Sequence, residues 1–169
     1  VANGQIDLAI IGGQLPGDLE NLLQVIPYAT DELALVLPPK HPLANKKELM
    51  KEDLYKLNFV TLDSQSTTRK VVDKLLKDSG LDIQRLKIEM ELNSLEAIKN
   101  AVQSGLGVSR LPVVSIEREL AGGSIHKPHI ADLEVKRELK LITNPSRYTS
   151  RASEVFKKYI LPQFASSES

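Results

Sequence analysis

Three short polar stretches of the chain could bind a small ligand. The richest combines amide, hydroxyl and guanidinium groups in the consecutive residues Gln65, Ser66, Thr67, Thr68 and Arg69. It follows an apolar run and opens an amphipathic one, so we expect it at a helix N-terminus. Unpaired N–H groups and a positive partial charge at such a terminus suit a carboxylate or phosphate. An ordinary helix cap with a solvated Arg69 is the alternative.

The other two stretches are smaller. Gly12, Gly13 and Gln14 follow an apolar run, and the glycines could let a ligand approach the backbone or could only form a turn. They lack the further glycine and the lysine of phosphate-binding loops, so a nucleotide motif is not predicted. Asn93 and Ser94 could present polar groups to a ligand or simply cap the next helix. Glu96 stands three residues after Asn93, which is capping-box spacing.

The sequence shows no set of residues for catalysis or metal binding. His126 and His129 are three residues apart, but Pro128 lies between them and no third ligand is evident. The chain has no cysteine, and its serines lack a nucleophile-elbow context. We therefore predict no metal and no cofactor, and we do not expect an enzyme.

Hydrophobic periodicity predicts the elements that position these stretches. Strands are expected at residues 6–11, 32–37, 58–62, 86–92, 108–111 and 138–143. Helices are expected at residues 51–56, 67–77, 94–104, 114–121 and 150–159. The alternation predicts an α/β fold with mainly parallel pairing, in which ligands bind at the carboxyl ends of strands. All three polar stretches follow predicted strands.

Two further details of the elements can be predicted. The run 6–11 resembles a strand that is covered on both faces. The last helix has one apolar face, which we expect to be buried and which consists of Val155, Phe156, Tyr159 and Ile160. The small polar residues 165–169 are predicted to be disordered.

Composition limits the classes of protein. Hydrophobic residues make up 41% and charged residues 26%, which is typical of a soluble globular chain, and no apolar run is long enough to span a bilayer. The 22 basic and 22 acidic residues give zero net charge, whereas a free-standing DNA-binding domain usually has a basic excess. The chain starts without methionine or signal peptide, and Gly4 is typical of a helix C-terminus. We therefore expect a piece of a longer protein.

Several short motifs in register resemble the effector-binding domain of LysR-type transcriptional regulators. The resemblance covers nearly the whole chain. The matching segments are 4–10, 31–37, His-Pro-Leu-Ala at 41–44, 53–54, 59–60, 67–69, Ser-Gly-Leu-Gly-Val at 104–108 and Leu-Pro at 111–112.

A narrower resemblance is to the cyanobacterial and plastid regulators of inorganic-carbon uptake and RuBisCO genes. It is carried by segments 1–5, 10–13, 52–57 and, most strongly, 86–104. Those regulators sense 2-oxoglutarate, 2-phosphoglycolate, ribulose bisphosphate or NADPH, all of which are anions. This sequence departs from that subgroup at Ser109-Arg110-Leu111, where smaller or apolar residues are usual, so the effector and the role of Arg110 stay open.

The resemblance implies two Rossmann-like lobes of the periplasmic-binding-protein type II kind. Lobe I would comprise residues 1–30 and 138–169, incomplete at its N-terminus, and lobe II residues 31–137. A small anionic metabolite would bind in the cleft between them, held by the three polar stretches. Family members form dimers within tetramers and contact DNA through an N-terminal helix-turn-helix that is absent here. The resemblance also implies the cytoplasm, or the plastid stroma in an alga, and no contact with a membrane.

Two other functions remain open from the residues alone. A solute-binding protein of a transport system has a related two-lobe fold, and a small α/β enzyme would share the element pattern. A helix-turn-helix upstream of Val1 would favour regulation, and a signal peptide there would favour transport. The enzyme alternative lacks an identifiable nucleophile, base or metal set.

Overall fold

Two parallel strands, β3 (Asn58–Leu62) and β4 (Lys87–Leu92), form one sheet of the computed structural model, which describes residues 1–161. Helix α1 (Thr67–Asp78) connects them. Phe59 and Val60 are both buried but belong to different apolar clusters, as expected for neighbouring residues of a strand. The cluster around Phe59 includes Leu76 of α1. β3 is therefore covered on both faces.

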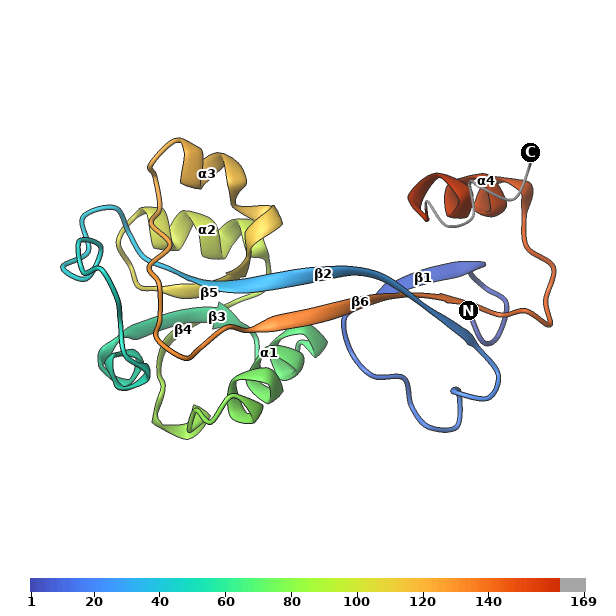
Figure 1. Ribbon diagram of the computed structural model, residues 1–169, viewed down its shortest axis with the longest axis horizontal. Coiled ribbons are helices and arrows are strands. Elements are labelled where there is room, and N and C mark those ends of the chain that lie inside the picture. Colours follow the sequence, from blue (N-terminus) through green and yellow to red (C-terminus); the bar gives the residue numbers. More distant parts are fainter. Residues whose placement is uncertain (162–169) are drawn as a thin grey trace. The chain divides into compact units, whose positions relative to one another are not determined.

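Helix α2 (Leu95–Gln103) and the short α3 (Glu117–Ala121) follow in the same part of the chain. Figure 1 shows them on the side of the strands opposite α1. Ile98 and Val102 of α2 pack with Val60 in the second cluster. Two short 3-10 helices, at Lys51–Lys56 and Ile83–Arg85, and a third at Val113–Ser115 complete the helical elements of this region.

Strand β5 (Ser109–Pro112) pairs antiparallel with the long β2 (Gln24–Val36), with Arg110 opposite Leu35. Directly opposite residues of an antiparallel pair share a face of the sheet. Leu33 and Leu35 belong to the cluster beneath α1, whereas Val36 and Leu111 belong to the cluster beneath α2. Arg110 therefore extends from the face that α1 covers.

The remaining elements are β1 (Leu8–Ile11), β6 (Lys136–Thr143) and α4 (Arg151–Ile160). β1 pairs antiparallel with β6, and Ile26, Leu141 and Leu161 form a small apolar cluster. The Asp7 carboxylate accepts hydrogen bonds from the backbone and hydroxyl of Ser150 and from the hydroxyl of Ser153, at the start of α4. These hydrogen bonds lower the pKa of Asp7.

The chain divides into two units, one from Asp31 to Arg137 and the other comprising residues 1–30 together with those from 138 onward. The division crosses β2 and β6, each of which contributes residues to both units. Strand order is β1-β6-β2-β5 in one sheet and β3-β4 in the other. None of the helices in residues 1–161 is long and apolar enough to cross a membrane.

Most predicted elements exist, but the predicted pairing is wrong. β3 and β4 pair in parallel, whereas β1–β6 and β2–β5 are antiparallel, so the described strands are not mainly parallel. The run 6–11 is not covered on both faces, because β1 begins at Leu8 at the edge of its sheet and Ile10 is 42% exposed. β2 starts eight residues earlier than the predicted 32, beyond Pro27.

Helix details also differ from the predictions. The N-cap of α2 is Ser94, whose hydroxyl accepts a hydrogen bond from the Ala97 amide, so a capping box from Asn93 to Glu96 is wrong. Val155, Phe156 and Tyr159 of α4 are exposed rather than buried, with Tyr159 at 87%. The predicted helix at 114–121 is split into a 3-10 turn and α3. The predicted disordered residues 165–169 lie outside the described residues.

Candidate functional site

Three backbone amides of the loop between β3 and α1 already donate hydrogen bonds to other groups of the protein. The Ser64 amide donates to Oε2 of Glu91 at 3.3 Å, and the Gln65 amide donates to Oδ1 of Asp63 at 2.7 Å. The Ser66 amide donates to the Asp63 carbonyl at 2.9 Å. These three amides are therefore occupied, and the amides of the first helical turn, Thr67 and Thr68, are the ones without a carbonyl partner inside the helix.

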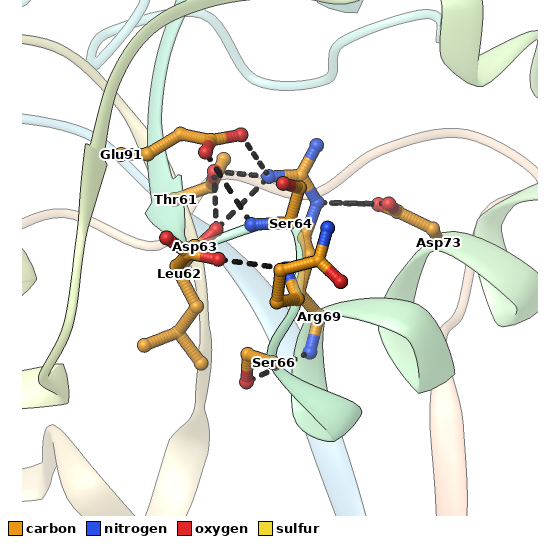
Figure 2. Close-up of polar contacts among 9 residues, drawn as sticks. Thr61, Leu62, Asp63, Ser64, Ser66, Arg69, Asp73 and Glu91 are labelled. Carbon is orange, nitrogen blue, oxygen red and sulfur yellow. Dashed lines mark hydrogen bonds and ion pairs between the residues drawn. The ribbon is translucent and has the colours of Figure 1, made fainter.

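Arg69 is held by this loop and by its own helix. Figure 2 shows its guanidinium between Asp73 and Glu91. Its Nε lies 2.8 Å from Oδ2 of Asp73, its Nη1 lies 3.5 Å from Oε1 of Glu91, and it also donates to Thr61 and to the Leu62 carbonyl. Its side chain is only 14% exposed. A solvated Arg69 is thus wrong, although the other part of that alternative holds, since Ser66 caps α1.

These contacts change what the loop can do chemically. Arg69 faces two carboxylates, and Asp63 adds a third acid to the same loop. Its positive charge is therefore neutralised locally, which makes it a poor partner for a further anion. Arg69 instead fixes the end of β3 to the first turns of α1, and so positions Thr67 and Thr68.

A cavity of about 50 Å³ lies beside this first turn, with most of its wall apolar. Its apolar residues come from both clusters and include Leu33, Phe59, Val72 and Ile98. The polar side chains in its wall are Thr61, Thr68, Arg69, Asp73, Ser109 and Arg110. The cavity is therefore small and mostly apolar, and its polar side chains come from β3, α1 and β5.

Arg110 is the most unusual of these polar groups. Its Nη1 donates to the Leu33 carbonyl at 3.3 Å, and its buried Nη2 has no hydrogen-bond partner in the part of the chain that the structure describes. Burial lowers the pKa of Arg110 to about 10, so the side chain is still charged at neutral pH. Sequence reasoning noted Arg110 as a departure from the family pattern but did not place it in the site.

The other predicted residues are distributed over both units. Asn93 and Ser94 lie between β4 and α2 in unit 31–137, where the Ser94 hydroxyl is used in capping, while the next residue, Leu95, lines the cavity. Gly12 and Gly13 form a bend directly after β1 in the other unit, and Gln14 follows them. Of the predicted site residues, the structure thus brings Thr68 and Arg69 to the cavity, together with Arg110, whereas 12–14 belong to a separate unit.

The histidines do not form a metal site in residues 1–161, where no group of three or more potential ligands is found. His129 lies 3.3 Å from Glu48, and the His126 backbone pairs with Leu37. Neither histidine lines the cavity.

Residues 1–165 match the family described as the LysR substrate binding domain. The chain belongs to this family. It is 58% identical over 165 residues to a protein of Synechocystis sp. (strain PCC 6803) named "Probable RuBisCO transcriptional regulator", covering 98% of this chain and 48% of that protein. A protein of the same name from Porphyra purpurea is 56% identical over 164 residues, covering 97% of this chain and 52% of the relative.

Solved structures of the LysR family show the same architecture. The Synechocystis CcmR regulatory domain in complex with 2-PG matches with a TM-score of 0.80 and 25% identity, covering 98% of this chain and 76% of that one. The effector-binding domain of QuiR in complex with shikimate matches with a TM-score of 0.75 and 24% identity, covering 98% and 75%. The expected α/β fold of the LysR type is confirmed. The chain spans about half the length of the curated relatives that it matches.

Proposed function

We propose that this chain is the effector-sensing part of a LysR-type transcriptional regulator of carbon-acquisition genes and that its effector is a small anionic metabolite. The observation that carries the proposal is the family match over residues 1–165, together with relatives named as RuBisCO transcriptional regulators. The 2-PG complex of the CcmR regulatory domain supports an anionic effector. A solute-binding protein of a transport system is not favoured by these relatives.

The geometry supports an anion as ligand. The cavity has Thr68 of the first turn of α1 in its wall, together with the guanidinium of Arg110, which has no acidic partner among residues 1–161. Helix N-termini and arginines bind carboxylate and phosphate groups. The predicted site residues 65–69, together with Asn93, Ser94 and the segment Gly12-Gly13-Gln14, remain part of the proposal.

The proposed mechanism is a shift of population. A metabolite that binds one conformation of the sensor more tightly than another increases the fraction of that conformation. In a dimer or tetramer this shift would change how DNA-binding segments of the longer protein are presented to DNA. We place the protein in the cytoplasm, or in the stroma of a plastid if the source is an alga. No enzymatic step and no cofactor are part of this function.

Isothermal titration calorimetry tests the proposal. The protein is expressed with any coding sequence that precedes Val1 in its gene and is titrated with 2-phosphoglycolate, 2-oxoglutarate and ribulose 1,5-bisphosphate, with glycerol as an uncharged control. We expect saturable heat from at least one of the anions and none from glycerol. Absence of heat with all three anions contradicts the proposal.

A further inference from the structure

The wall of the cavity beside α1 contains one more positive than negative charge. Its charged groups are Arg69, Asp73 and Arg110. Arg69 is paired with Asp73 at 2.8 Å and with Glu91, which does not line the cavity, at 3.5 Å. No salt bridge joins Arg110 to an acid in residues 1–161, so the excess charge is that of Arg110.

An unpaired guanidinium in a buried position is unfavourable, because burial removes its hydration without supplying an opposite charge. Arg110 Nη1 donates to the Leu33 carbonyl, while Nη2 is left without an acceptor among the described residues. The buried Oδ1 of Asp31 is likewise without a partner, but the carboxylate of Asp31 is already paired through Oδ2 with Arg137 at 2.7 Å. Arg110 is thus placed at the expense of stability, as is common for residues that serve a ligand.

We propose that Arg110, rather than Arg69, pairs with the acidic group of the ligand in this cavity. The inference rests on the proposed function and assigns the charge recognition to a residue that the family pattern does not predict. A cavity of about 50 Å³ suits one carboxylate or phosphate group rather than a whole metabolite. Thr68, in the first turn of α1, lines the same cavity and could supply a further donor through its hydroxyl. The apolar remainder of the wall strengthens these contacts by excluding water.

Two variants separate this role from a structural one. R110M keeps an unbranched apolar side chain of similar length and removes the charge. R110Q removes the charge but keeps an amide donor for the Leu33 carbonyl. The matched control is R118Q, which removes the same charge from an exposed position of α3. Each protein is titrated with 2-phosphoglycolate, 2-oxoglutarate, ribulose 1,5-bisphosphate and inorganic phosphate, and its thermal midpoint is measured with and without each anion.

We expect the affinity of R110M and R110Q for the anion that binds the unmodified protein to fall roughly 10- to 100-fold, as for the loss of a charged hydrogen bond. The midpoint of ligand-free R110M should stay unchanged or rise, since a buried unpaired charge has been replaced by an apolar group. R118Q should bind as the unmodified protein does. This combination would not arise if Arg110 only stabilised the fold, for instance through Asp31.

Other outcomes overturn the inference in distinguishable ways. If the unmodified protein binds an anion and R110Q binds it equally well, Arg110 is not the charge partner, while the proposed function stands. If R110M does not fold, the affinity of R110Q decides. If the unmodified protein binds none of the four anions, both the inference and the proposed function are contradicted.

Discussion

Nε of Arg69 lies 2.8 Å from Oδ2 of Asp73, one turn further along α1. Because of this ion pair, Arg69, the one arginine of the Gln65–Arg69 stretch, has a structural role. Arg69 holds the loop that starts α1, whereas the unpaired charge of the cavity is that of Arg110 on strand β5. The separation of these two roles has consequences that can be measured.

Replacing Asp73 with asparagine should leave Arg69 with Glu91 as its remaining acidic partner. We expect the free energy of unfolding to fall by about 0.5 kcal/mol, which is typical of a helical pair four residues apart. Urea denaturation measures this change. D78N is the control, because it removes the same charge from an exposed position at the end of α1. There an acid opposes the helix dipole, so D78N should be neutral or slightly stabilising. An equal loss in both variants would contradict a specific Arg69–Asp73 contact.

Replacing Gly107 with alanine should destabilise the protein strongly. A Cβ at this position would lie 2.8 Å from the Asn58 carbonyl oxygen and 2.9 Å from Cγ2 of Val60. The backbone cannot shift freely, since the neighbouring Val108 exchanges hydrogen bonds with Asn58 and Val60. We expect a loss of about 2 kcal/mol in the free energy of unfolding, from the overpacking. G17A is the control, because nothing lies within 4 Å of a Cβ there. Unchanged stability of G107A would contradict the close approach of residue 107 to Asn58 and Val60.

Lowering the pH should reduce the free energy of unfolding, and protonation of Asp53 should cause part of this loss. Its carboxylate accepts hydrogen bonds from Lys46 Nζ at 2.7 Å and from the Met50 amide at 3.1 Å, which lower its pKa from 3.8 to about 2. A lowered folded-state pKa means that the stabilisation is fully present above about pH 4 and is lost as the pH falls towards 2. In D53N the free energy of unfolding should vary less between pH 4 and pH 2, by about 1 kcal/mol after allowance for solvent screening. Identical pH profiles of D53N and the unmodified protein would contradict this.

Periodicity predicts the local elements well because they depend on neighbours in the sequence. The strand at Asn58–Leu62 and the start of α1 at Thr67 fall where the apolar pattern puts them. Strand direction does not follow from such a pattern, so the antiparallel β2–β5 pairing was missed. The apolar pattern of α4 predicts a face but not what covers it, and Phe156 and Tyr159 are exposed in the described structure.

In the candidate site too, the local features could be predicted from the sequence and the long-range contacts could not. The hydroxyls and amides of Ser66 and Thr67 can be predicted at a helix start because capping is local. The neutralisation of Arg69 depends partly on Glu91, which is 22 positions later in the sequence. The approach of Arg110 to the Leu33 carbonyl joins residues 77 positions apart. Contacts of this length depend on tertiary pairing, which one sequence does not reveal.

A crystal structure of the protein with 2-phosphoglycolate bound would show directly which guanidinium pairs with the anion. We expect one acidic group of the ligand in the cavity beside α1, within hydrogen-bond distance of Arg110 Nη2, and the Arg69–Asp73 contact intact. A ligand bound elsewhere, with Arg110 Nη2 still lacking an anionic partner, would contradict this expectation.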